Sequence, residues 1–227
     1  MPPSIRQVVS YCEAHPLDQH PFLSWRSGAP EPLTKAFDIL LNAYGLAANF
    51  PTWLAGVIAH LDDRRIQSLL ARQLNGELGD GDPSRMHILL YQRAITLLAP
   101  FRPVLPPEEA TAPAARLLHG AERYLCSHDP YEALGALVAG EVFGSQFFAW
   151  FGAELARQSH IEPSSLDWFG AHETVEVEHA RDAALISQLV ADLPERREAV
   201  WRGALGMDWV LTTFLSDLHQ RYVVELP

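Results

Sequence analysis

The sequence predicts an all-α protein, a single-domain bundle of seven to eight helices. Apolar residues recur at helical spacing over most of the chain, strand signals are nearly absent, and short connections rich in Gly and Pro separate the helical segments. With 227 residues, 48% of them hydrophobic, the chain can bury a sizeable core. We expect one domain over residues 1–227. A domain boundary in the Pro-rich stretch 99–113 is the alternative.

The expected helices follow one another with short loops: 33–44, 50–61, 62–78, 83–98, 111–130, 131–160, 165–193 and 194–223. Pro51 suits the first turn of the second helix, and the run GDGDP ends the third. Asp82 and Pro83 are typical of the N-cap and first position of the fourth. The sixth is apolar nearly all round, so we expect it to be central and buried.

Charge and cysteine content exclude several classes of protein. The formal net charge of −11 argues against binding to nucleic acid or to an anionic membrane surface, since both attract basic patches. Cys12 and Cys126 are too few for a disulfide framework. We find no secretory signal, and polar residues interrupt the apolar stretch 37–59 in an amphipathic pattern. We therefore expect a soluble cytoplasmic protein with no membrane partner.

The segment HETVEVEHARD, residues 172–182, suggests a metal site. On a helix, His172, Glu176 and His179 lie within roughly 60° of one another and form a single stripe. Two imidazoles and a carboxylate on one stripe can bind a transition metal. A solvated helix face with ordinary charged pairs is the alternative.

Glu141 is the only charged residue between Glu132 and Glu154. A carboxylate on such an apolar helix is retained when it is paired, binds a metal or takes part in acid–base chemistry. A salt bridge to an arginine is the simplest alternative. Gly144 and Ser145, one turn further on, leave space beside the acid, which could line a substrate pocket or allow close helix packing.

The segment NGELGDGDPSRMHILLY, residues 75–91, holds Glu77 at a helix end and His87 in the first turns of the next helix. Ten residues separate them, so the break between the helices must bring them together if both bind one metal. Separately, Glu77 could be a surface residue and His87 a core residue. Tyr91 lies one turn beyond His87, where it could line the same cavity or simply pack.

Together these segments resemble the haem-oxygenase-like diiron oxidases, a family within the fold group of TenA-type thiaminases and the PQQ-synthesis oxidase. The resemblance covers HPFLSW (20–25), FPTWLAGVIAHLDD (50–63), GELGDGDPSRMH (76–87), ALGALVAGE (133–141) and HETVEVEHARDA (172–183). It implies a haem-oxygenase-like fold. The order and spacing of the last three segments carry most of it.

The resemblance also implies the ligands of two iron ions, and O2 as co-substrate. Carried over residue by residue, they are Glu77, His87, Glu141, His172, Glu176 and His179. Glu141 would bridge the ions. The chain departs from the family pattern in two places. The family more often has Asp at the position of Glu176, and the gap before His87 is longer than in some relatives, so Asp80 competes with Glu77.

The function implied by the resemblance is O2-dependent oxidation of a small carboxylate-bearing metabolite, in natural-product biosynthesis. We expect a free amino acid, on which C–H abstraction leads to desaturation, C–C or C–N cleavage or formation, cyclisation or N-oxygenation. Relatives of the same fold that decarboxylate fatty acids are the alternative. A substrate carboxylate would need a cation. Arg72, Arg85 and Arg93 lie near the motifs, but no spacing selects one of them.

Four other classes remain. A mononuclear iron or manganese oxidase would use part of the same ligand set. A metal-free TenA-like enzyme could use Cys126 as a nucleophile, although this residue is also a suitable buried hydrophobe. A haem oxygenase would need only one axial histidine, and a non-catalytic binding protein would need no metal. The aromatic run FFAWFG (147–152) would suit a homodimer interface or the core.

Overall fold

The structure is a computed structural model, and it describes residues 5–14, 19–24, 32–101, 111–155, 182, 185–186, 189–190 and 194–221. Within these ranges the chain forms helices and turns and no strand, which confirms the predicted all-α class. The elements are α1 (Ile5–Glu13), α2 (Pro21–Ser24), α3 (Pro32–His60), α4 (Arg64–Glu77), η2 (Pro83–Arg85), α5 (His87–Leu98), η3 (Ala99–Phe101), α6 (Ala112–Leu125), α7 (Pro130–Leu155) and α9 (Pro194–His219).

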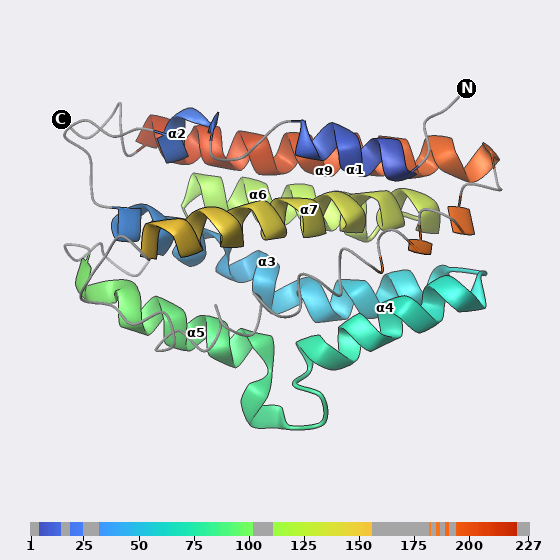
Figure 1. Cartoon of the computed structure of the whole chain (residues 1–227), viewed down its shortest axis with the longest axis horizontal. Coiled ribbons are helices and arrows are strands. Elements are labelled where there is room, and N and C mark those ends of the chain that lie inside the picture. Colours follow the sequence, from blue (N-terminus) through green and yellow to red (C-terminus); the bar gives the residue numbers. More distant parts are fainter. Residues whose placement is uncertain are drawn as a thin grey trace.

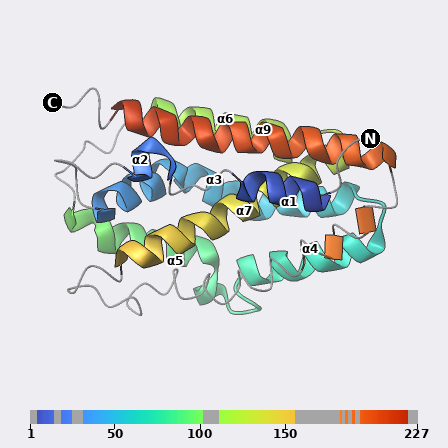
Figure 2. The same ribbon diagram turned by 45° about the horizontal axis from the view of Figure 1, so that its top comes forward.

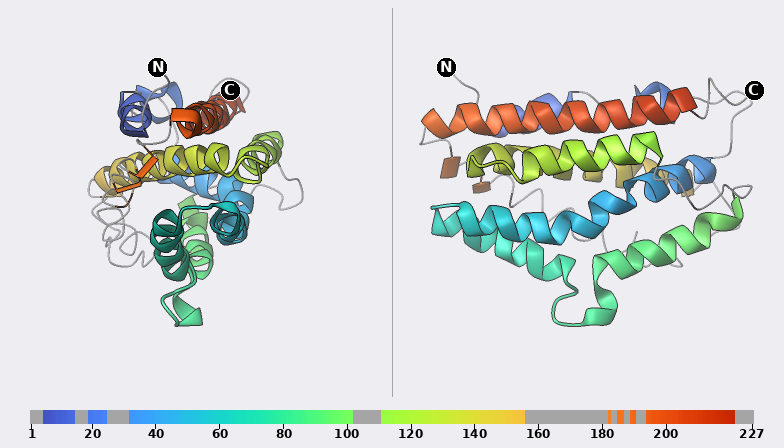
Figure 3. Two further views of the ribbon diagram at one scale, coloured as in Figure 1. Left: turned by 90° about the vertical axis from the view of Figure 1, so that its right-hand side faces the viewer. Right: turned by 180° about the vertical axis from the view of Figure 1, so that it is seen from behind.

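The helices form a layered bundle around α7 (Figure 1). Helices α1 and α9 lie side by side in one outer layer, α6 and α7 form the middle, and α3 lies on the opposite side (Figures 2 and 3). Helices α4 and α5 pack on α3 and diverge from a common loop as the two arms of a V. The point of this V carries the first pair of predicted ligands.

The structure corrects the predicted division between the first and second expected helices. The sequence predicted separate helices at 33–44 and 50–61, whereas α3 runs without interruption from Pro32 to His60 with Pro51 inside it. Proline in a helix interior removes one backbone hydrogen bond and kinks the helix without always ending it. Accordingly, α3 changes direction part of the way along its length (right-hand view of Figure 3).

Aspartates cap two of the helical elements, and one of them, Asp82, was predicted from the sequence. Asp63 caps α4, and its Oδ1 accepts a hydrogen bond from the backbone N–H of Arg65 at 2.9 Å. Asp82 caps with Pro83 at the first position, as expected, but the turn that they begin is the short η2. Helix α5 itself begins at His87. The sequence predicts no helix before residue 33, whereas α1 and α2 form there.

Helix α7 is the core helix of the bundle. It packs against α1, α3, α6 and α9, and every residue from Ala133 to Ala139 is buried, Gly135 included. Among the described residues, the segment Pro130–Glu154 is also the one helix long and apolar enough to cross a membrane. More than half of its most apolar window is buried, as in the core of a soluble protein.

Two glycines allow α7 and α9 to approach backbone to backbone. A Cβ atom on Gly135 would lie 1.9 Å from the carbonyl oxygen of Val200, and one on Gly203 would lie 1.8 Å from that of Glu132. Both contacts are with backbone, which cannot rotate away as a flexible side chain could. The absence of a side chain at these two positions therefore sets the separation of the two helices, and with it the position of Glu141 further along α7.

We predict opposite effects of one substitution at two positions of α7. Gly135→Ala should destabilise the protein by about 1–3 kcal/mol, because the methyl group must displace α9. Gly140→Ala should stabilise it by about 0.5–1 kcal/mol, because alanine favours the helix and its methyl group meets no atom within 4 Å. Urea unfolding of both variants measures the difference. Equal stability of the two variants would contradict the close approach of α7 and α9.

Candidate metal centre

The loop between α4 and α5 brings Glu77 and His87 together. Glu77 is the last residue of α4 and His87 the first of α5. Nδ1 of His87 lies 3.1 Å from Oε1 of Glu77, and the exposed fractions of these side chains are only 11% and 12%. The loop thus brings two side chains that are ten residues apart in the sequence into direct contact. This is the result expected if the break in the helical pattern serves to join Glu77 and His87.

Glycine makes this closure possible. Gly79, Asp80 and Gly81 follow one another with φ values of 87°, 53° and 87°, a left-handed stretch that reverses the chain direction. A Cβ atom on Gly79 would lie 2.2 Å from the carbonyl oxygen of Asp82, whereas one on Gly81 would meet nothing within 4 Å. Gly79 is therefore required both by its backbone conformation and by the tight fold of the loop.

The loop also distinguishes Glu77 from Asp80 as candidate ligands. Asp80 is exposed, and its Oδ1 accepts a hydrogen bond of 2.9 Å from the side-chain amide of Asn75. It does not line the cavity described below, whereas Glu77 does. The geometry favours Glu77 as the partner of His87.

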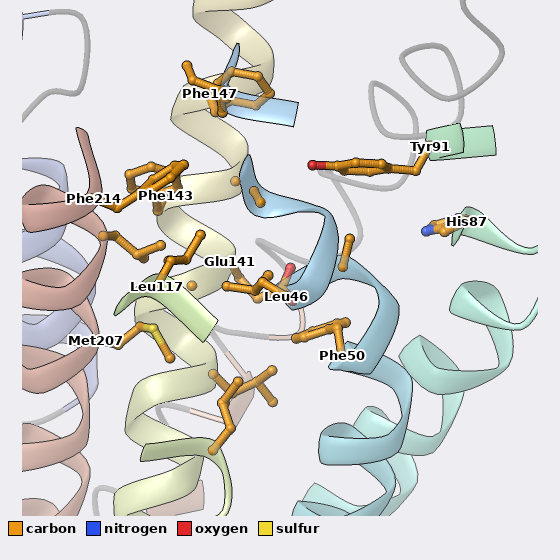
Figure 4. A pocket seen from close by; sticks show the side chains of 18 of the residues that line it. Leu46, Phe50, His87, Tyr91, Leu117, Glu141, Phe143, Phe147, Met207 and Phe214 are labelled. Atoms are coloured by element: carbon orange, nitrogen blue, oxygen red, sulfur yellow. The ribbon is translucent and has the colours of Figure 1, made fainter. Parts of the chain in front are cut away.

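Glu141 faces the same cavity from α7 (Figure 4). Its Oε1 accepts a hydrogen bond from the side-chain amide of Gln73, which lies on α4 one turn before Glu77. The acid is partly buried, and the Gln73 amide is a neutral hydrogen-bond donor to it. Helix α7 therefore borders both the packed core and the cavity, and its apolar residues suit both surroundings.

The cavity has a volume of about 190 Å³ and is largely apolar. In Figure 4, His87 and Tyr91 lie on one side of Glu141 and Met207 and Phe214 on the other. Helices α3, α6, α7 and α9 supply most of the apolar wall: Ile39, Leu40, Ala43, Leu46, Ala47, Phe50, Leu117, Leu125, Leu137, Phe143, Phe147, Phe148, Met207, Leu211 and Phe214.

The three residues suggested for the substrate pocket have different positions. Tyr91 and Gly144 line the cavity, whereas Ser145 is exposed and lies outside the lining. The Tyr91 hydroxyl donates a hydrogen bond of 2.8 Å to the carbonyl oxygen of Leu40. Burial raises the pKa of Tyr91 above its usual value, so this hydroxyl stays protonated at neutral pH. Tyr91 thus presents its ring to the cavity, and its hydroxyl holds α5 to α3.

The third motif, with His172, Glu176 and His179, lies outside the described residues. The nearest described residue is Asp182, three positions after His179. Asp182 is buried and forms an ion pair with Arg72, the residue that precedes Gln73 on α4. Asp182 is therefore attached to the helix that carries Gln73 and Glu77.

The described residues supply only part of the ligands that a metal ion would need. Within the described ranges, no three side chains of His, Cys, Asp or Glu come close enough to hold an ion. They supply one imidazole–carboxylate pair, His87 with Glu77, and one separate carboxylate, Glu141, on the wall of the same cavity. Nitrogen and oxygen donors of this kind suit iron or manganese, so the residues present fit such an ion in chemistry.

Sequence reasoning missed Gln73. Its position four residues before Glu77 places both side chains on one face of α4, and this spacing is the only signal that could have found it. The three arginines considered for a substrate carboxylate do not line the cavity. Arg72 pairs with Asp182, and Arg85 and Arg93 lie outside the lining.

A helical bundle whose central cavity is apolar except for a few imidazole and carboxylate groups is typical of non-haem metal enzymes. Comparison with known proteins agrees: residues 38–209 match the model of a family described as iron-containing redox enzyme. The chain belongs to this family, and is therefore an oxidoreductase of an iron-containing class. No curated protein matches it.

Two crystal structures of a CADD-like protein of unknown function from Nostoc punctiforme share the fold. The first has a TM-score of 0.73 at 13% sequence identity, and the match covers 98% of this chain and 95% of that one. For the second, also with a TM-score of 0.73 and 13% identity, the match covers 96% and 98%. At this identity the likeness supports the fold alone.

We predict that Gly79→Ala weakens iron binding more than Gly81→Ala. Both variants place a side chain in the left-handed region, which costs about 1–2 kcal/mol. Gly79→Ala also forces the Asp82 carbonyl away and should cost a further 1–3 kcal/mol. Anaerobic Fe(II) titration and urea unfolding measure both effects. If the two variants bind iron equally well, the loop does not position Glu77 against His87.

Proposed function

We propose that this protein is an O2-dependent non-haem diiron oxidase or oxygenase that acts on a small carboxylate-bearing metabolite, a free amino acid. The observation that carries the proposal is that Glu77, His87 and Glu141 line one apolar cavity, from three different helices. Membership of the iron-containing family supports iron as the metal. His172, Glu176 and His179 would complete the set of six ligands.

The ion pair between Asp182 and Arg72 supports the contribution of the third motif. It holds a residue three positions beyond His179 against α4, whose inner face carries Gln73 and Glu77. Three imidazoles and three carboxylates are a composition suited to two iron ions. When bound, iron would supply the oxidation of a substrate C–H bond by O2.

The chain's own contribution would be placement and exclusion of water. The apolar wall leaves few groups that could hold water beside the ligands, and the Tyr91 hydroxyl is already satisfied by Leu40. Glu77 and His87 sit at fixed helix ends, and Glu141 is held by Gln73. A substrate bound beside Glu141 would meet the metal in a largely dry site.

The cavity limits the substrate in size and polarity. An engineered protein cavity of about 150 Å³ binds benzene, so about 190 Å³ suits a molecule, or part of one, only somewhat larger. The apolar lining suits a hydrophobic side chain. Among the described lining residues there is no Lys or Arg, so the charged end of an amino acid would lie next to the ligands or against the rest of the chain.

The same lining makes a fatty acid the second candidate substrate. A hydrocarbon chain needs no polar partner, and the walls of Phe143, Phe147 and Phe214 would accept one. The volume argues the other way, because a long chain would need a larger cavity. A mononuclear enzyme with part of the ligand set is a further alternative, and metal stoichiometry separates it from the diiron enzyme.

The proposal is tested by iron stoichiometry and by reaction with O2. We predict two Fe(II) per chain after anaerobic reconstitution, and a transient visible absorption when the loaded protein is mixed with O2 in a stopped-flow spectrometer. The transient should decay faster with hydrophobic amino acids than with acidic ones, because the lining is apolar. One iron per chain would favour the mononuclear enzyme, and faster decay with fatty acids alone would favour the second candidate.

The variant Glu141→Ala tests whether Glu141 belongs to the proposed metal site. It should remain folded, since it removes a charge from an apolar helix, yet lose bound iron and the O2-dependent transient. Circular dichroism checks the fold. Retention of both iron and the transient by Glu141→Ala would contradict the assignment of the site.

A further inference from the structure

Gln73 occupies a distinctive position on α4. Its side chain is partly buried on the face that also carries Glu77, and its amide donates a hydrogen bond to Oε1 of Glu141 on α7. Helix α4 packs mainly against α3 and α5. The hydrogen bond thus connects α4, which carries the candidate ligand Glu77, with α7, which carries the candidate ligand Glu141.

From this geometry we infer that Gln73 is a positioning residue that orients the Glu141 carboxylate toward the metal. The inference rests on the proposed function. The hydrogen bond engages one carboxylate oxygen, so it fixes the rotation of the carboxylate group and with it the direction of the second oxygen. Residues that hydrogen-bond to a metal ligand in this way set its orientation and are typically worth 10- to 100-fold in metal affinity or activity.

A neutral amide suits this role better than a charged donor. An arginine or lysine would compete with the metal for the carboxylate by charge, whereas the amide of Gln73 orients it and adds no charge to the site. Because Gln73 and Glu77 lie one turn apart on α4, any displacement of that helix would move the orienting group and one ligand together. The two carboxylates are therefore coupled through a single rigid element.

Gln67, on the same helix, provides the control. Its side-chain amide donates hydrogen bonds of 2.8 and 2.9 Å to the backbone carbonyls of Ile58 and Leu61. These contacts close the end of α3 and do not involve any candidate ligand. Gln67→Leu should thus reproduce the general effect of losing a partly buried glutamine from α4, without an effect on Glu141.

The experiment compares Gln73→Leu with Gln67→Leu and the unaltered protein, each titrated anaerobically with ⁵⁷Fe(II) and measured by Mössbauer spectroscopy. Gln73→Leu removes the donor at similar volume. We expect roughly 10- to 100-fold weaker binding of iron and a changed quadrupole splitting for the iron that Glu141 binds. Gln67→Leu should lower stability in urea and leave the iron spectrum and affinity unchanged.

The outcomes separate the two claims. If the unaltered protein binds no iron, the proposed function is wrong. If it binds iron, and Gln73→Leu has the same affinity and spectrum, Gln73 does not orient Glu141 and the inference is overturned. If both glutamine variants change affinity and spectrum equally, the effect comes from the general stability of α4, which also overturns it.

Discussion

Helix α7 must fill the middle of the bundle and still present one carboxylate to a cavity, and the rest of the structure depends on how it does both. Its surroundings on α1, α3, α6 and α9 require an apolar surface. Gly135 lets α9 approach to backbone contact, while Gly140 borders open space directly beside Glu141. Glycine thus has two different effects along α7. At Gly135 the missing side chain lets α9 pack closely, and at Gly140 it leaves space in the cavity.

The V formed by α4 and α5 is the second half of the arrangement. Its point brings Glu77 against His87, and its first arm carries Gln73 to Glu141 and Arg72 to Asp182. Helix α4 therefore contacts His87, Glu141 and Asp182, each with a different side chain. The candidate ligands come from segments far apart in the sequence. Contacts with a single helix can orient several of them at once, which lowers the entropy lost when they are held in place.

The sequence predicted what local chemistry determines. The approximate extent of α4, the cap Asp82 and the meeting of Glu77 with His87 across the break all follow from a capping residue and left-handed glycines. Continuation of α3 through Pro51 was not predictable, because tertiary packing decides whether a proline ends a helix or bends it. The Gly135 and Gln73 contacts depend on which helices become neighbours, and no single segment encodes that. The third motif stays a prediction, since it lies outside the described residues.

The most direct test of the account is a crystal structure of the Fe(II)-loaded protein, with anomalous diffraction measured at the iron absorption edge. We predict two anomalous peaks at the cavity, one of them bonded to Glu77 and His87 and both within bonding distance of Glu141. A single peak, or iron bound away from these three residues, would contradict the assignment of the cavity as a diiron centre.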